Sequence, residues 1–176
     1  MGVKTWVCKI CGDPYIGEEK PTECPFCGAN HKYIVPGTEY KEPVVGEVSQ
    51  KSASNVMAAI KLEVDNAQFY FCASRKASTV ELQKRFKALG KVESEHATLL
   101  SKIVKAQNPA ISRDIDMCKA DDRALMQEAL EREDRAIKKY TEFLGQATEM
   151  RVKQVFAALV EIENTHLELE ENSLNN

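Results

Sequence analysis

Apolar residues recur every three or four positions over four long stretches of the chain, which places them on one face of an α-helix. The pattern predicts helices over about 53–76, 79–106, 122–146 and 149–172. The join within each pair is short, which predicts two antiparallel hairpins. The connection over 107–120 reaches roughly 46 Å when extended, against about 39 Å for a helix of about 26 residues. The second hairpin can therefore pack beside the first as a four-helix bundle.

The first 45 residues lack this periodicity and carry most of the prolines and glycines. Turn-forming residues at this density predict loops and short strands. A segment of about 45 residues cannot bury enough apolar surface to fold unaided, so we expect a bound metal to stabilise it. We predict two domains, 1–45 and 52–176, joined by a short polar linker.

The two halves of the helical region carry the same series of residues at an offset of 70 positions. The spacing keeps each set on one stripe of its helix, and on every stripe a glutamate stands among apolar residues. The repeated polar residues are Glu63, Tyr70, Glu93 and His96 in the first half, and Glu133, Tyr140, Glu163 and His166 in the second.

Four glutamates converging in a core would cost several kcal/mol each unless they ligate metal. Two divalent ions resolve the conflict, because four carboxylates balance four positive charges and each imidazole takes one ion. One Glu from each of two helices, with a Glu-x-x-His pair from each of the others, is the ligand set of di-iron carboxylate bundles. The competing interpretation is a repeat bundle whose charges face water. Tyr70 and Tyr140 either hydrogen-bond a ligand carboxylate or are plain core aromatics.

Four cysteines form two C-x-x-C-Gly segments near the N-terminus, a pattern that favours metal ligation over disulfides in a reducing compartment. Tetrahedral sulfur ligation suits Zn or a single Fe, so the spacing leaves the metal open. Cys72 is expected to be a small buried apolar residue, and Cys118 a plain thiol. The four candidate ligands are Cys8, Cys11, Cys24 and Cys27.

Composition narrows the function. The net charge is −3, with no block of Lys or Arg, so neither nucleic acid nor a membrane surface is an expected partner. No signal peptide is evident, and no apolar run approaches the roughly 20 residues that span a bilayer. The expected location is cytoplasmic.

The two sites together resemble those of rubrerythrins, specifically the reversed type in which a rubredoxin-like domain comes first. The N-terminal likeness rests on Trp6-Val-Cys8-Lys-Ile-Cys11-Gly, Tyr15, Gly17-Glu18, Pro21 and Cys24-Pro-Phe-Cys27-Gly-Ala29. The Glu, Tyr and His series is similar to that of the family's ferritin-like di-iron domain. The implied fold is mainly α, a ferritin-like four-helix bundle with a small rubredoxin-like metal-binding domain.

The resemblance implies one Fe on the four cysteines and two Fe in the carboxylate–histidine site, with Glu93 and Glu163 as bridges; Zn or Mn can substitute. It implies that the six ligands, with Tyr70 and Tyr140, are the catalytic residues. Family members reduce hydrogen peroxide to water in oxidative-stress defence. Their electrons come from a nicotinamide-linked rubredoxin reductase or rubredoxin through the rubredoxin-type iron. They are commonly homodimers or larger homo-oligomers, in which centres of different subunits face each other.

One position departs from the family pattern. Typical rubrerythrins have a further glutamate three residues after the ligand that matches Glu133, and this chain has Ala136. The site would then be closer to a bacterioferritin or ferroxidase centre. The alternative function is a di-iron ferroxidase, oxygen reductase or iron-handling protein. A non-enzymatic alternative is a zinc ribbon on a metal-stabilised bundle used for interaction.

Overall fold

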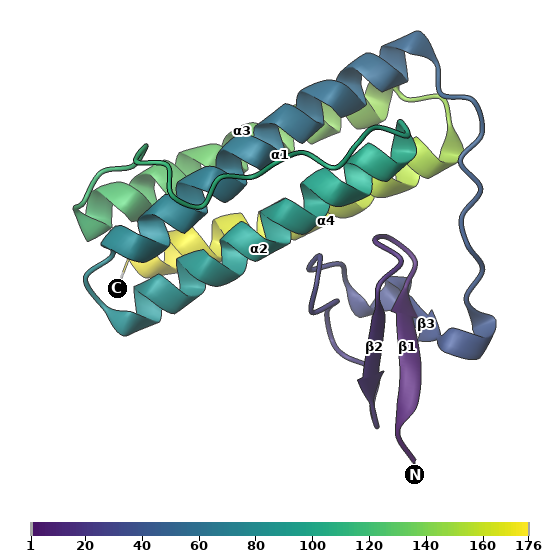
Figure 1. Ribbon diagram of the computed structural model, residues 1–176, viewed down its shortest axis with the longest axis horizontal. Helices are drawn as coiled ribbons and strands as arrows, with labels where there is room; N and C mark the ends of the chain where they lie inside the picture. The colour runs from purple at the N-terminus through teal and green to yellow at the C-terminus, as the bar shows by residue number, and fades with distance from the viewer. Residues whose placement is uncertain (1, 176) are drawn as a thin grey trace.

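The computed structural model describes residues 2–175, which form four long α-helices and a small three-stranded sheet (Figure 1). Each helix begins and ends within three residues of the predicted bounds, and the mainly α fold is confirmed. The helices are α1 (Gln50–Lys76), α2 (Val80–Ile103), α3 (Asp122–Gln146) and α4 (Met150–Leu174).

Side chains cap the N-termini of α1, α2 and α3. Ser49, Thr79 and Asp121 each accept a hydrogen bond from the backbone N–H three residues later, at 3.3, 3.2 and 2.8 Å. These bonds satisfy donors that have no partner inside the helix. At its other end α2 stops three residues before the predicted bound, because Lys105 adopts a left-handed conformation with φ of +53°.

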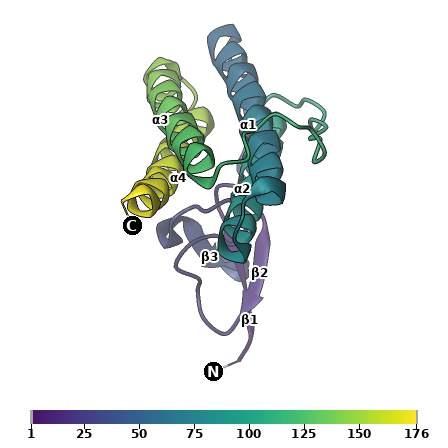
Figure 2. The same cartoon turned by 90° about the vertical axis from the view of Figure 1, so that its left-hand side faces the viewer.

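The four helices are arranged as two antiparallel hairpins, α1 with α2 and α3 with α4 (Figures 1 and 2). The connection from α2 to α3 runs back along the bundle beside α1, as its length allowed (Figures 1 and 2). Within residues 2–175, none of the helices combines the length and the apolar composition needed to cross a lipid bilayer.

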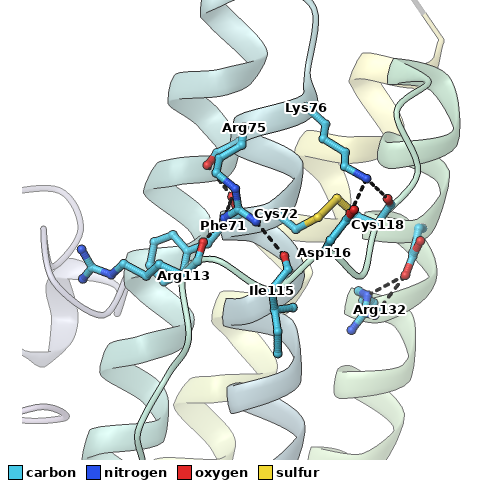
Figure 3. The surroundings of a disulfide bond; sticks show 11 residues. Phe71, Cys72, Arg75, Lys76, Arg113, Ile115, Asp116, Cys118 and Arg132 are labelled. Carbon is cyan, nitrogen blue, oxygen red and sulfur yellow. Dashed lines mark hydrogen bonds and ion pairs between the residues drawn. A yellow bond between two sulfur atoms is a disulfide. The ribbon is translucent and has the colours of Figure 1, made fainter.

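A disulfide between Cys72 and Cys118 joins α1 to this connection, so the prediction of two separate thiols was wrong (Figure 3). The cysteines are 46 residues apart, and no local pattern relates them. Backbone carbonyls of the same segment accept further bonds from α1. Arg75 Nη2 donates to the Ile115 carbonyl at 2.6 Å, and Lys76 Nζ donates to that of Cys118 at 2.7 Å. The connection is therefore fixed to α1 by covalent and polar links.

The sheet holds the N-terminal region together and has the antiparallel order β2-β1-β3. Its strands are β1 (Lys4–Cys8), β2 (Pro14–Gly17) and β3 (Ile34–Pro36). Trp6 on β1 lies opposite Tyr15 on β2, and its indole N–H donates to the Gly17 carbonyl at 3.3 Å. The loops and short strands predicted for this region are confirmed.

The N-terminal region packs against α2 and α4, between the middle of the bundle and the end where α2 stops and α4 begins (Figure 1). Lys102 of α2 donates to the Cys11 carbonyl at 3.2 Å, and Arg151 of α4 donates to the Lys9 carbonyl at 2.8 Å. The four cysteines of the N-terminal region belong to one continuous core with apolar side chains of the helices. This packing brings the two predicted sites close together.

Candidate metal centres

The first candidate centre is formed by the four predicted cysteines, all of which are buried. Each C-x-x-C-Gly segment forms a turn, or knuckle, that presents two cysteines. The first knuckle, at the end of β1, presents Cys8 and Cys11, and the second presents Cys24 and Cys27. Each knuckle closes with a glycine in the left-handed region, Gly12 at φ +89° and Gly28 at φ +75°. The sulfur atoms of the two knuckles consequently face one another.

The sulfur spacing fits a single tetrahedral ion. Sγ atoms of Cys8 and Cys27 are 3.8 Å apart, and those of Cys11 and Cys24 are 3.7 Å apart. Metal–sulfur bonds of about 2.3 Å in a tetrahedron require sulfur atoms about 3.8 Å apart. The backbone N–H groups of Ile10 and Asp13 point at sulfur atoms, each at 3.4 Å, as donors that tune a thiolate metal site. The four cysteines therefore fit a rubredoxin-type Fe.

The second candidate centre lies inside the bundle, where each helix contributes a glutamate and α2 and α4 each add a histidine. Five of the six side chains have no exposed area, and that of His166 is 9% exposed. The structure thus brings together every carboxylate–histidine ligand predicted from the sequence. These residues are Glu63, Glu93, His96, Glu133, Glu163 and His166.

Glu93 and Glu163 stand between the two histidines. Nδ1 of His96 lies 3.2 Å from Glu93 Oε2 and 3.3 Å from Glu163 Oε1. The other oxygen of each carboxylate faces the second histidine, since His166 Nδ1 lies 3.3 Å from Glu93 Oε1 and 2.9 Å from Glu163 Oε2. Glu63 lies by His96, at 3.5 Å, and Glu133 by His166, at 3.9 Å. The six residues therefore form two four-residue groups that share two carboxylates.

The charges of this cluster require cations. One oxygen of each of the four glutamates is buried and accepts no hydrogen bond from residues 2–175. Burial and the nearby charge of Glu93 raise the pKa of Glu63 well above its ordinary value. Burial alone would lower the pKa of His96, but Glu63 and the other carboxylates raise it. Without metal the cluster must hold protons instead. Two divalent ions can take the place of these protons, and the four carboxylates and two imidazoles fit as their ligands.

Each tyrosine hydrogen-bonds a glutamate of the opposite half. The Tyr70 hydroxyl donates to Glu133 Oε1, and the Tyr140 hydroxyl donates to Glu63 Oε1. The structure therefore favours the hydrogen-bonding interpretation of both tyrosines. Because each phenol comes from the other hairpin, the bonds also tie the two hairpins together across the site.

One hydrogen bond joins the two candidate centres. Nε2 of His96 lies 2.9 Å from the backbone carbonyl of Cys27, and it is the donor because a carbonyl can only accept. When the ring is neutral, its proton is therefore on Nε2, and the lone pair of Nδ1 points toward the carboxylates. This arrangement is typical of a metal-ligating histidine. A Cβ atom added at Gly28 would lie 3.1 Å from Ile162 Cγ2 on α4, so the knuckle approaches the bundle closely. Sequence reasoning missed this contact because a backbone carbonyl has no residue signature.

Comparison with known proteins agrees with the geometry. The family model described as Rubrerythrin matches residues 54–174, well over half of the chain. Reverse rubrerythrin-1 of Clostridium acetobutylicum is 26% identical over 113 residues, which cover 58% of this chain and 62% of that relative. The cysteine site precedes the matched region, in the reversed domain order. The chain belongs to the rubrerythrin family.

Proposed function

We propose that the protein is a non-haem di-iron peroxidase that reduces hydrogen peroxide to water in oxidative-stress defence. The reaction consumes two electrons and two protons for each peroxide and yields two waters. The observation that carries the proposal is the hydrogen bond between His96 and the Cys27 carbonyl, because it connects a one-electron thiolate site to a dinuclear site. When bound, the two irons supply electrons and polarise the substrate oxygens.

The six bundle residues divide their tasks by position. Glu63 and Glu133 would each bind one metal, and the two tyrosines orient these carboxylates through their hydroxyl groups. Glu93 and Glu163, whose oxygens face both histidines, would bridge the pair. His96 and His166 would complete the two sets.

The proposed electron route stays within one chain. It runs from the Cys27 sulfur through that residue's own backbone to its carbonyl, and across the 2.9 Å bond to His96. Both Cys27 and His96 are fully buried, so water does not interrupt this route. A nicotinamide-linked rubredoxin reductase or rubredoxin would deliver electrons to the cysteine site.

Replacing Cys8 with Ser tests the relay. This change removes one thiolate and leaves the bundle ligands untouched. Steady-state peroxide reduction with a reductase should fall at least about 100-fold, while a single oxidation of preloaded diferrous protein keeps its rate. The matched control is Ser112→Ala, an exposed hydroxyl in the connection. Equal survival of both activities in the Cys8→Ser protein would exclude the relay.

A second candidate function is an oxygen-consuming ferroxidase or iron-handling protein, and Ala136 favours it. Ala136 is fully buried on α3, one turn after Glu133, and offers no seventh ligand. Stopped-flow oxidation of diferrous protein by peroxide and by oxygen separates the two functions. The peroxidase proposal expects the peroxide rate constant to be larger by at least about tenfold, which is a difference of about 1.4 kcal/mol in barrier. A larger rate constant with oxygen would favour the ferroxidase.

A further inference from the structure

A buried ion pair lies outside the six candidate ligands. Glu170 of α4 is fully buried, yet neither carboxylate oxygen accepts a hydrogen bond from any residue the structure describes. Nη2 of Arg85, on α2, lies 3.6 Å from Glu170 Oε2, too far for a hydrogen bond. Nε and Nη2 of Arg85 are also buried, and within residues 2–175 they have no hydrogen-bond acceptor. Four polar atoms are thus left without a hydrogen-bond partner, although the two side chains form an ion pair.

The repeat holds no second copy of this pair, which joins α2 of the first half to α4 of the second. The positions 70 residues away are Val155 in place of Arg85 and Leu100 in place of Glu170. Both of these residues are fully buried in the apolar core. An apolar pair therefore suffices for packing, and the ion pair needs an explanation other than folding.

The ion pair lies beside the His166 half of the dinuclear site. Glu170 follows His166 by one turn of α4, and Arg85 precedes Glu93 by about two turns of α2. Burial raises the pKa of the Glu170 carboxyl to about 7, and the nearby charges of Arg85 and His166 act in the opposite direction. The side chains of His166 and Arg85 keep 9% and 11% of their area exposed, whereas that of His96 keeps none. This half of the site is consequently the one nearer to solvent.

The unpartnered atoms match the hydrogen-bonding groups of one substrate class. Hydrogen peroxide has two O–H donors for the Glu170 oxygens and lone pairs that accept from the Arg85 N–H groups. Dioxygen has no hydrogen to donate, so it gains little there. We propose that Arg85 and Glu170 bind hydrogen peroxide on its way to the His166 half of the site. This inference rests on the proposed peroxidase function and adds the residues that select its substrate.

The test uses a double variant that copies the residues at the equivalent positions of the repeat, Val155 and Leu100. Arg85→Val with Glu170→Leu copies the equivalent apolar pair, and such replacements of buried ion pairs commonly keep the fold. The control, Lys139→Gln with Glu142→Gln, removes an exposed ion pair of α3. Stopped-flow measurements follow oxidation of diferrous protein over a range of peroxide concentrations, and by oxygen. In the double variant the half-saturating peroxide concentration should rise about tenfold, as expected for two lost hydrogen bonds. The saturated rate, the oxygen rate and the control should stay within about twofold.

A second readout needs no turnover. A crystal structure of the zinc-loaded wild-type protein, soaked in peroxide, should contain a molecule bonded to both Arg85 and Glu170, and the double variant should lack it. The inference would be overturned if the double variant kept the wild-type half-saturating peroxide concentration, or if its oxidation by oxygen slowed as much as its oxidation by peroxide. Either result would leave the peroxidase proposal in place. If peroxide fails to oxidise wild-type protein, the proposed function fails. In that case the soaked crystal alone tests whether Arg85 and Glu170 bind peroxide, and the absence of a bound molecule there overturns the inference.

Discussion

Removing the disulfide between Cys72 and Cys118 should lower the free energy of unfolding by about 4 kcal/mol. The cysteines are 46 residues apart in the sequence. A cross-link that closes a loop of this length lowers the entropy of the unfolded chain by about 14 cal/mol/K, which is about 4 kcal/mol at 25 °C. Both residues lie in a buried cluster with Tyr70, so the native connection is held against α1 at the site's edge.

The perturbation is Cys72→Ala with Cys118→Ala, and guanidinium unfolding followed by circular dichroism measures the loss. Metal content must be matched in all samples, because bound metal adds its own stability. Each alanine also removes a buried sulfur, a packing loss on the order of 1 kcal/mol. Wild-type protein with the disulfide reduced keeps both sulfur atoms and isolates the cross-link. A loss below about 1 kcal/mol in that sample would refute the loop-entropy reasoning.

Three further changes test other parts of the structure. Hydrogen bonds from the Ser52 hydroxyl and a backbone N–H lower the pKa of Glu149 to about 2, from an ordinary 4.5. This stabilisation is complete above pH 4.5 and is lost as the pH falls to about 2. Glu149→Gln should therefore lower the free energy of unfolding by about 1 kcal/mol above pH 4.5 and have no effect near pH 2, as measured by thermal unfolding over a range of pH. Tyr70→Phe should weaken metal binding about 10–100-fold in the His166 half of the site, and Tyr140→Phe should do the same in the His96 half, as measured by chelator competition. If either variant weakened both halves equally, the assignment of each tyrosine to one glutamate would be contradicted. Removing metal from the cysteine site should expose the amides of β1, β2 and β3 to rapid hydrogen exchange while the helices stay protected.

The helices and the ligand set could be predicted because both depend on local spacing. Apolar periodicity reveals each helix, and a Glu-x-x-His pair places two ligands on one side without any tertiary information. Contacts between distant segments had no such signal. The Cys72–Cys118 disulfide and the pairing of Arg85 with Glu170 depend on where α1, the connection, α2 and α4 meet. The domain bounds 1–45 and 52–176 stay a prediction.

Gly28 bears on the distance that electrons would cross in the proposed relay. Its backbone is in the left-handed region, and a single added carbon would press on Ile162. A side chain at position 28 would require Ile162 or the second cysteine knuckle to shift by a few tenths of an ångström, close to the bond between Cys27 and His96. Electron tunnelling slows steeply with distance, so in the proposed relay we expect a side chain at position 28 to slow the transfer between the two centres.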